Sequence, residues 1–155
     1  MLKHRIRSSL RLTLGGALLA IALGAVPAAA RPAITKPQFI AQADGLCARA
    51  IAQLHTAGAG GSLSTLATRG PRLIAIDTST LAALRRVPQP SADAARISAM
   101  LSGAAATIGE LRAIISAVRS GNRSDVRTHG LRYAALARRW HSAAAGYGLT
   151  SCAHW

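Results

Sequence analysis

The sequence predicts an all-α protein, a four-helix up-down bundle closed by one disulfide. Apolar side chains recur at steps of three, four and seven residues along four segments, as in amphipathic helices. Stretches containing glycine or proline separate these segments, and no convincing pair of strands is present. The two cysteines, Cys47 and Cys152, lie near the two ends of the part of the chain that we expect to fold.

The first thirty residues have the three-part pattern of a secretory signal. A basic stretch without acids (1–11) precedes an apolar run rich in Leu and Ala (12–26), and small residues ending at Ala30 suit a signal peptidase. We therefore expect cleavage after Ala30, which leaves residues 31–155 as a single helical domain. The alternative is a retained membrane anchor, but the apolar run of 15 residues is short for a span that needs about 20.

This signal also predicts where the protein acts. A Sec-type signal implies a secreted, periplasmic or cell-envelope protein. No cysteine lies near the cleavage site, so we do not expect a lipoprotein.

The first helix is expected over residues 36–55. Thr35 begins a capping box, with Pro in the first turn. The apolar positions that follow form one stripe that includes Cys47. Asp44 falls at the edge of this stripe, so we interpret it as a boundary residue rather than an acid catalyst. A glycine-rich linker (57–62) follows the helix.

The second helix is expected over residues 64–86, with a break at 70–71. The break is predicted because Gly70 precedes Pro71, and proline cannot continue a helix unbroken. Asp77 lies within the apolar stripe of this segment. The two prolines in 87–90 then give a firm stop.

The third helix, expected over residues 92–120, has the clearest periodicity. Apolar or small residues recur every seven positions at Ile97, Ala104, Leu111 and Val118. This spacing resembles the seam of an antiparallel bundle helix. Gly121 and Asn122 are the signal for its end.

The fourth helix is expected over residues 125–146, after Ser124 as cap. Its core stripe also has a spacing of seven, through Val126, Tyr133, Trp140 and Tyr147. The arginines that lie mostly off this stripe are Arg127, Arg132, Arg138 and Arg139. Two glycines end the helix, and 149–152 turns back toward the bundle. We expect the last two residues, His154 and Trp155, to be frayed or lightly packed.

The two cysteines predict an intramolecular disulfide. An even number of cysteines in an exported chain makes a bridge the default, and the pair is not in a redox-active CxxC motif. The alternatives are an intermolecular bridge and a free or metal-bound thiol. A bridge between Cys47 and Cys152 would join the first helix to the C-terminal segment.

The net positive charge of residues 31–155 indicates which class of molecule the protein could bind. Residues 31–155 hold 15 Lys and Arg against 5 Asp and Glu, a net charge of +10. Such a charge attracts polyanions, which outside the cytoplasm are anionic lipids, envelope polymers and acidic proteins. Nucleic acid is not expected as a partner of an exported chain. The alternative is a solubilising charge set by genome composition, because Arg outnumbers Lys 17 to 2.

Motifs for catalysis or metal binding are absent from the sequence. It contains no Gly-x-Ser-x-Gly elbow, no phosphate-binding loop and no His-Glu-x-x-His pattern. Asp125 and His129 share a helix face, but two ligands do not make a metal site, and we expect a surface contact. We therefore predict no catalytic residues, no metal and no cofactor. Trp140, flanked by arginines, is a candidate for stacking on a ligand, although its stripe favours the core.

Two end motifs resemble those of a known group of proteins. The chain begins its first helix with Phe-Ile-Ala-x-Ala-Asp-x-x-Cys, ending at Cys47, and finishes with Tyr-Gly-Leu-Thr-x-Cys, ending at Cys152. These motifs resemble small exported or lipid-anchored helical proteins of high-GC, mostly actinobacterial, bacteria. The resemblance implies the helical fold and the disulfide. It implies no activity, because the group is functionally uncharacterised.

Two functional hypotheses follow. The first is a non-catalytic secreted or envelope-associated protein that binds an anionic envelope component or acidic partner, with the four arginines of 125–146 as candidate anion-binding residues. The second is a carrier of a small lipid or haem-like ligand, held in a cavity within the bundle near Trp140. The sequence leaves the oligomeric state open.

Overall fold

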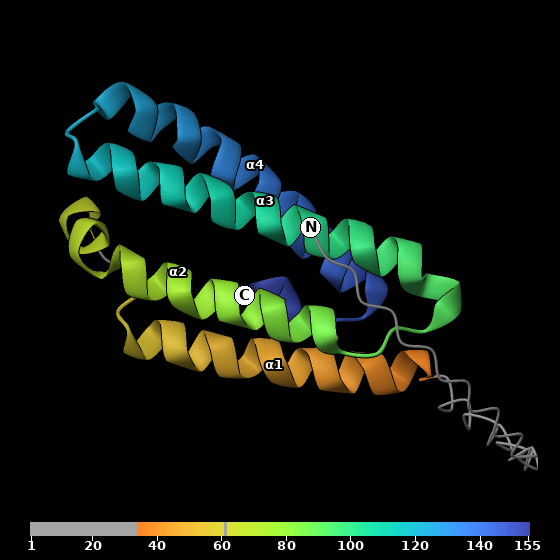
Figure 1. Cartoon of the computed structure of the whole chain (residues 1–155). Coiled ribbons are helices and arrows are strands. Elements are labelled where there is room, and N and C mark those ends of the chain that lie inside the picture. The colour runs from red at the N-terminus through yellow and green to blue at the C-terminus, as the bar shows by residue number, and fades with distance from the viewer. Residues whose placement is uncertain (1–33, 61) are drawn as a thin grey trace, which may run out of the picture. The chain divides into compact units, whose positions relative to one another are not determined.

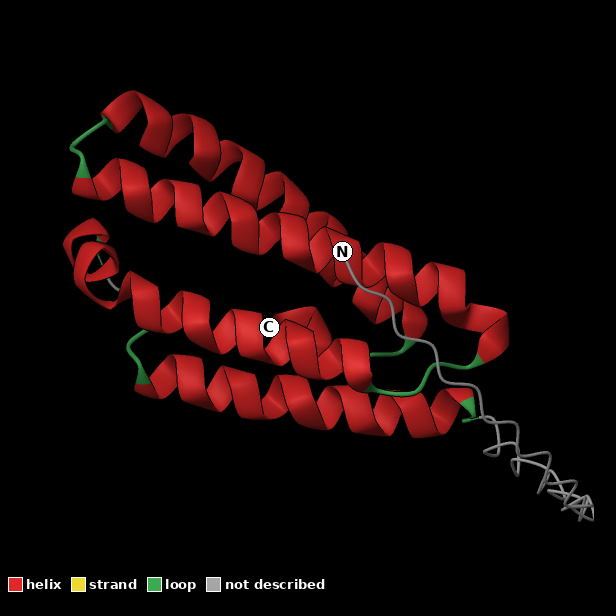
Figure 2. Cartoon of the chain, in the orientation of Figure 1, coloured by secondary structure: helices red, strands yellow, loops and turns green. Residues whose placement is uncertain are grey.

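The all-α prediction is confirmed by the computed structural model, which describes residues 34–60 and 62–155. Its elements are α1 (Lys36–Thr56), α2 (Leu63–Arg86), η1 (Ser91–Asp93), α3 (Ala94–Arg119), α4 (Arg123–Tyr147) and η2 (Cys152–His154) (Figures 1 and 2). The elements labelled η are short 3-10 helices. The expected signal and its cleavage after Ala30 lie outside the described residues.

Consecutive helices pack against each other in the order of the chain. α1 packs against α2, α2 against α3, and α3 against α4, with short connections between them (Figure 1). The C-terminal η2 packs against both α4 and α1. The predicted four-helix bundle closed by a disulfide is therefore confirmed, and the segment that carries Cys152 joins the last helix to the first.

Helix starts follow from their capping side chains. Thr35 accepts a hydrogen bond from the Gln38 amide, and Gln38 Oε1 accepts one from the Thr35 amide at 2.9 Å, which completes the predicted capping box. α4 begins two residues earlier than predicted, at Arg123. The reason is that Asn122, which we interpreted as an end signal for the third helix, caps the fourth: its Oδ1 accepts from the Asp125 amide at 3.2 Å.

The predicted break at 70–71 is wrong, because α2 continues through Pro71. Proline has no N–H, so it cannot donate to the carbonyl four residues earlier, on Ala67. Arg119 of α3 supplies the missing donor, with its Nε 3.0 Å from the Ala67 oxygen. The proline bends the helix without ending it: the first turns of α2 run in a different direction from the rest (Figure 1).

At Gly70, α2 packs tightly against Ile115 of α3. A Cβ at this position would lie 2.6 Å from Ile115 Cδ1 and 2.7 Å from Ile115 Cγ1, closer than real Cβ atoms come. The glycine therefore allows the two helices to meet at Ile115. The pair Gly70-Pro71, which we interpreted as a break, is a contact site between helices.

The hydrophobic core lies in the half of the bundle that contains the C-terminal segment. It joins residues from all four helices to the tail: Phe39, Ala43, Cys47, Leu81, Leu84, Ile97, Met100, Leu101, Ala104, Ile108, Trp140, Ala144, Tyr147, Leu149 and Cys152 are among its buried members. The predicted stripe of α4 is buried at Trp140 and Tyr147 but only half-buried at Val126 and Tyr133. η2 thus covers only the second half of α4.

α3 is the most apolar helix of the described residues. Together with η1 it is long and apolar enough, by length and composition alone, to cross a membrane. The core helix of a bundle passes the same test, and α3 packs against both α2 and α4.

Candidate functional site

The C-terminal segment (148–155) turns back from the end of α4. Gly148 has a φ of +102°, a left-handed conformation that glycine adopts without strain. The amides of Gly148 and Leu149 both donate to the Ala144 carbonyl, and the Leu149 side chain is 1 % exposed. The chain is thereby directed into the space beside α1.

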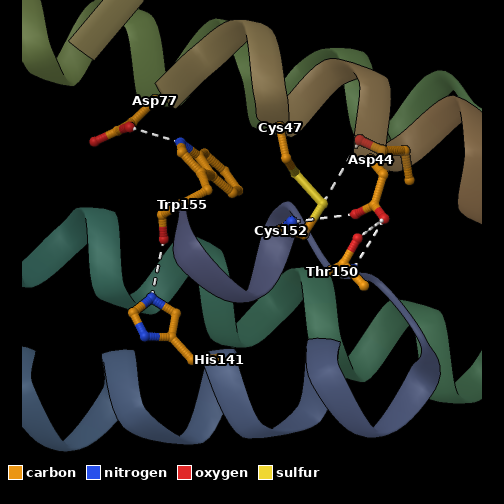
Figure 3. Close-up of a disulfide and its surroundings, with 8 residues drawn as sticks. Asp44, Cys47, Asp77, His141, Thr150, Cys152 and Trp155 are labelled. Atoms are coloured by element: carbon orange, nitrogen blue, oxygen red, sulfur yellow. Dashed lines mark hydrogen bonds between the residues drawn. A yellow bond between two sulfur atoms is a disulfide. The ribbon is translucent and has the colours of Figure 1, made fainter. Parts of the chain in front are cut away.

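Asp44 of α1 anchors this segment (Figure 3). Its Oδ2 accepts from the amide and the hydroxyl of Thr150, both at 2.9 Å, and its Oδ1 accepts from the Cys152 amide at 3.1 Å. The prediction that Asp44 is a boundary residue is consistent with this role. Its carboxylate receives three hydrogen bonds from a segment more than 100 residues later.

The predicted disulfide joins Cys47 to Cys152, one helical turn from Asp44. Both cysteines are fully buried. The bridge and Asp44 therefore fix the same short segment against α1, one covalently and the other by hydrogen bonds.

Two helices hold Trp155, which makes the prediction of a frayed or lightly packed end wrong for this residue, whereas His154 is exposed. Its indole Nε1 donates to Asp77 Oδ1 of α2 at 3.0 Å, and its carbonyl oxygen accepts from His141 Nε2 of α4 at 2.9 Å (Figure 3). Its ring also meets Trp140 edge to face, with centroids 5.7 Å apart. The last residue of the chain is thus a packing element.

A small cavity lies beside Trp155. Its volume is about 80 Å³, and its lining combines Asp77, Tyr133, Trp140 and Trp155 with apolar side chains of α1 and α3. Burial raises the pKa of Asp77 from 3.8 to about 6, and the Trp155 hydrogen bond opposes this rise. Burial, and next the nearby Asp77 charge, raise the pKa of Tyr133.

The chemistry available in this cavity is hydrogen bonding by one carboxyl group among aromatic rings. The other polar side-chain groups of the described lining include the Trp155 indole and the hydroxyls of Thr107 and Tyr133. The Thr107 hydroxyl donates to the Gly103 carbonyl at 3.0 Å.

Each of the other three carboxyl groups among the described residues is also engaged. Asp93 accepts from the Tyr147 hydroxyl at 2.8 Å; burial first, and then this bond, raise the pKa of Tyr147 to about 12. Glu110 Oε2 lies 2.7 Å from Nδ1 of His129. Asp125 bonds the Asn122 amide group at 2.8 Å. The expected contact between Asp125 and His129 is therefore wrong, since each has another partner.

Apart from His129, the basic side chains of the described residues have no partner of opposite charge. All thirteen arginines of the described residues, and Lys36, are exposed. Within that part of the chain, no arginine or lysine lies within 4.0 Å of a carboxylate, and the His129–Glu110 contact is the one ion pair. Four of the five acids thus bond groups beyond their own helix, while the arginines and Lys36 remain on the surface.

The four candidate arginines of α4 do not form a single cluster. Arg127 and Arg138 are eleven residues apart and share one edge of the outer face, whereas Arg132 and Arg139 are seven apart and share the other. Arg138 and Arg139 line a shallow depression on α4. Arg139 also lines a groove against α3, whose floor includes Trp140.

Trp140 is 4 % exposed and belongs to the core, as its position on the apolar stripe of the fourth helix predicted. It lines both the inner cavity and the outer groove. No group of three or more His, Cys, Asp or Glu that could hold a metal ion occurs among the residues described. Sequence reasoning missed the role of Trp155, whose only signal was a large aromatic residue close behind Cys152.

Comparisons of the chain with family models, curated proteins and solved structures give no match.

Proposed function

We propose that this chain is an exported, non-catalytic protein that binds an anionic component of the cell envelope through its arginine-covered exterior. One observation carries the proposal: all five carboxyl groups outside the signal are engaged within the fold, while fourteen basic side chains of the described residues are exposed without a carboxylate partner. An uncompensated charge of this kind attracts anionic surfaces. The buried disulfide supports an oxidising compartment.

Anionic lipid is the first partner to test. The exported protein, with its disulfide intact, is mixed with vesicles of phosphatidylglycerol and phosphatidylcholine, or of phosphatidylcholine alone, and the sedimented fraction is measured. We expect binding to the anionic vesicles only, with a steep loss between about 0.05 and 0.5 M salt. Absent binding, or binding indifferent to salt, contradicts the proposal.

Two variants separate the contribution of α4 to vesicle binding from the contribution of the total net charge. One variant replaces Arg127, Arg132, Arg138 and Arg139 by Gln, and a matched variant replaces four exposed arginines elsewhere: Arg49, Arg72, Arg85 and Arg86. Both lower the net charge by four. If α4 is the binding face, the first variant loses more than about tenfold in vesicle affinity and the second much less. Equal losses would show that the charge acts without a preferred face.

Export is tested on the same protein. Mass spectrometry of material recovered outside the cytoplasm should give Arg31 as the N-terminal residue. A retained signal would favour the membrane-anchor alternative instead.

The size of the inner cavity favours this proposal over the carrier hypothesis. A cavity of about 80 Å³ is well below the roughly 300 Å³ at which small-molecule sites begin. Haem and lipid chains need more room than the space beside Trp155 offers. Tryptophan fluorescence titrated with haem tests the carrier, because Trp140 and Trp155 both line the cavity, and we expect no change.

A further inference from the structure

A groove between α3 and α4 combines arginine side chains with an apolar floor. Its volume is about 300 Å³, within the range of small-molecule sites. α3 contributes Arg96, Met100 and Gly103, and α4 contributes Arg139, Trp140 and Ala143. The groove is distinct from the inner cavity, from which Trp140 separates it.

The spacing of these residues explains the shape of the groove. Arg96, Met100 and Gly103 follow one another by four and three, so they lie along one stripe of α3. A Cβ added at Gly103 meets no atom within 4 Å, so the space above this residue is open. A small side chain on the facing helix, Ala143, leaves room on the other side.

The arginine on α3 is fixed in place before any ligand arrives. Arg96 Nη2 donates to the Gly146 carbonyl at 2.9 Å, and its guanidinium lies over the Tyr147 ring, 5.2 Å from the centroid. A guanidinium has five N–H donors, so most remain free. Among the described residues neither Arg96 nor Arg139 pairs with a carboxylate. A fixed cation loses little conformational entropy when it binds an anion.

We propose that this groove binds an anionic lipid, with the head group on the arginines and part of an alkyl chain on the floor of Met100, Gly103 and Trp140. An anion without a chain would leave the apolar floor uncovered, and a neutral chain would leave the arginines without a partner. The inference rests on the proposed function, since it gives the anionic partner a defined site.

The probe is dodecyl phosphate below its micelle concentration, titrated calorimetrically into the exported protein. We expect one saturable site, with a change in tryptophan fluorescence at the same concentration because Trp140 forms part of the floor. Inorganic phosphate and the neutral detergent octyl glucoside should each bind at least about tenfold more weakly. A neutral detergent or a bare phosphate that binds as tightly as dodecyl phosphate overturns the proposal.

Two matched pairs of variants locate the site. Gly103→Leu fills the groove without changing charge, and Gly109→Leu places the same side chain on the same helix, also with nothing within 4 Å of the new Cβ but outside the groove. Arg139→Gln removes a rim charge, and Arg123→Gln removes an equal charge from an exposed arginine at the start of α4, outside the groove and outside the four candidate arginines. We expect about tenfold weaker binding for Gly103→Leu and Arg139→Gln, and less than about twofold for the controls.

Circular dichroism and the unfolding midpoint first establish that the variants fold, so that a loss of binding reports on the groove. If the groove variants behave as their controls while anionic vesicles still bind, the groove proposal fails and the proposed function stands. If wild-type protein binds neither vesicles nor dodecyl phosphate, both fail.

Discussion

Asp44 holds the C-terminal segment with three hydrogen bonds, and its removal should be costly. Asp44→Ala leaves the amides of Thr150 and Cys152 without their acceptor. Because hydrogen bonds to a charged group contribute more than neutral ones, we expect the free energy of unfolding to fall by about 2–3 kcal/mol. Urea unfolding of the oxidised protein measures this loss.

Thr150→Val provides a graded comparison for Asp44→Ala. It removes only the hydroxyl bond and keeps the Thr150 amide on Asp44, so we expect a loss of about 0.5–1 kcal/mol. Equal stabilities of wild type and Asp44→Ala would show that the disulfide alone fixes the segment.

Asp77 should make stability depend on pH. Burial raises its pKa in the folded protein from 3.8 to about 6. The folded state therefore binds more protons than the unfolded state between these values, and the contribution of Asp77 to stability falls as pH rises through this window. Because one pKa unit is about 1.4 kcal/mol and the carboxyl group is partly solvated, we expect a fall on the order of 1–2 kcal/mol.

The variant that tests this is Asp77→Asn, which keeps an acceptor for Trp155 but does not titrate. Relative to wild type, its free energy of unfolding should increase from pH 4 to pH 7 by about the amount that the carboxyl group loses. Tyr133→Phe is the control, because it changes the same cavity and keeps the carboxyl group. A constant difference between Asp77→Asn and wild type across this range contradicts the prediction.

Single residues differ in how far the sequence determines their role. The disulfide could be predicted because the chain has two cysteines, so there was one intramolecular pair to form, and because we expected export to an oxidising compartment. The partner of Asp77 could not be predicted, since Trp155 lies 78 residues away and nothing local connects them. The same holds for Asp44, whose position at the edge of its stripe marked it as a boundary residue without indicating what it binds.

Within the helices, alanine at Gly70 and alanine at Gly109 should change the free energy of unfolding in opposite directions. Gly70→Ala places a Cβ 2.6 Å from Ile115, where three side-chain atoms obstruct it. We expect it to lower the free energy of unfolding by about 1–3 kcal/mol despite its better helix propensity. Gly109→Ala meets no atom within 4 Å and should raise it by about 0.5–1 kcal/mol.

Thermal unfolding of both glycine variants provides the measurement, and each serves as the control for the other. A stabilised Gly70→Ala would show that α2 and α3 can separate at this point without loss. A destabilised Gly109→Ala would indicate a contact on the outer face of α3.

The helices themselves were predictable, because their apolar periodicity and caps are local properties of the sequence. The continuity of α2 through Pro71 was not predictable. A proline removes one backbone hydrogen bond, and the sequence alone suggests that the helix must end there. In the folded protein Arg119, 52 residues away, bonds the carbonyl that Pro71 leaves free, and Gly70 brings α3 close enough for that contact. Tertiary structure thus overrides the local signal.

At the scale of the whole molecule, the acidic side chains form contacts within the fold, whereas the described arginine and lysine side chains are exposed. The five carboxylates hold the tail, Tyr147 and His129 of α4, and the start of α4. The arginines of the described residues are exposed and have no carboxylate partner. The composition predicted the sign of the charge, but not the partners of the acids, because four of the five form contacts with side chains or segments beyond their own helix.

The disulfide is the largest single contribution that the structure assigns to the stability of the whole chain. Cys47 and Cys152 are 105 residues apart, so their bridge restricts most of the unfolded chain from the first helix to the C-terminal segment. In the chain-entropy model a loop of about 100 residues is stabilised by about 4.7 kcal/mol. We therefore expect the double variant Cys47→Ala/Cys152→Ala to lose about 3–5 kcal/mol in urea unfolding.

Reduction gives an independent measurement of the same contribution. A reducing agent should lower the stability of wild type to near that of the double variant and should leave the double variant unchanged. The loss should also reach Trp155, since the segment that carries it is then held only by non-covalent contacts, among them the hydrogen bonds to Asp44, Asp77 and His141. Tryptophan fluorescence should therefore change at lower urea concentration than helical circular dichroism. Coincident transitions would show instead that the tail and the bundle unfold as one cooperative unit even without the bridge.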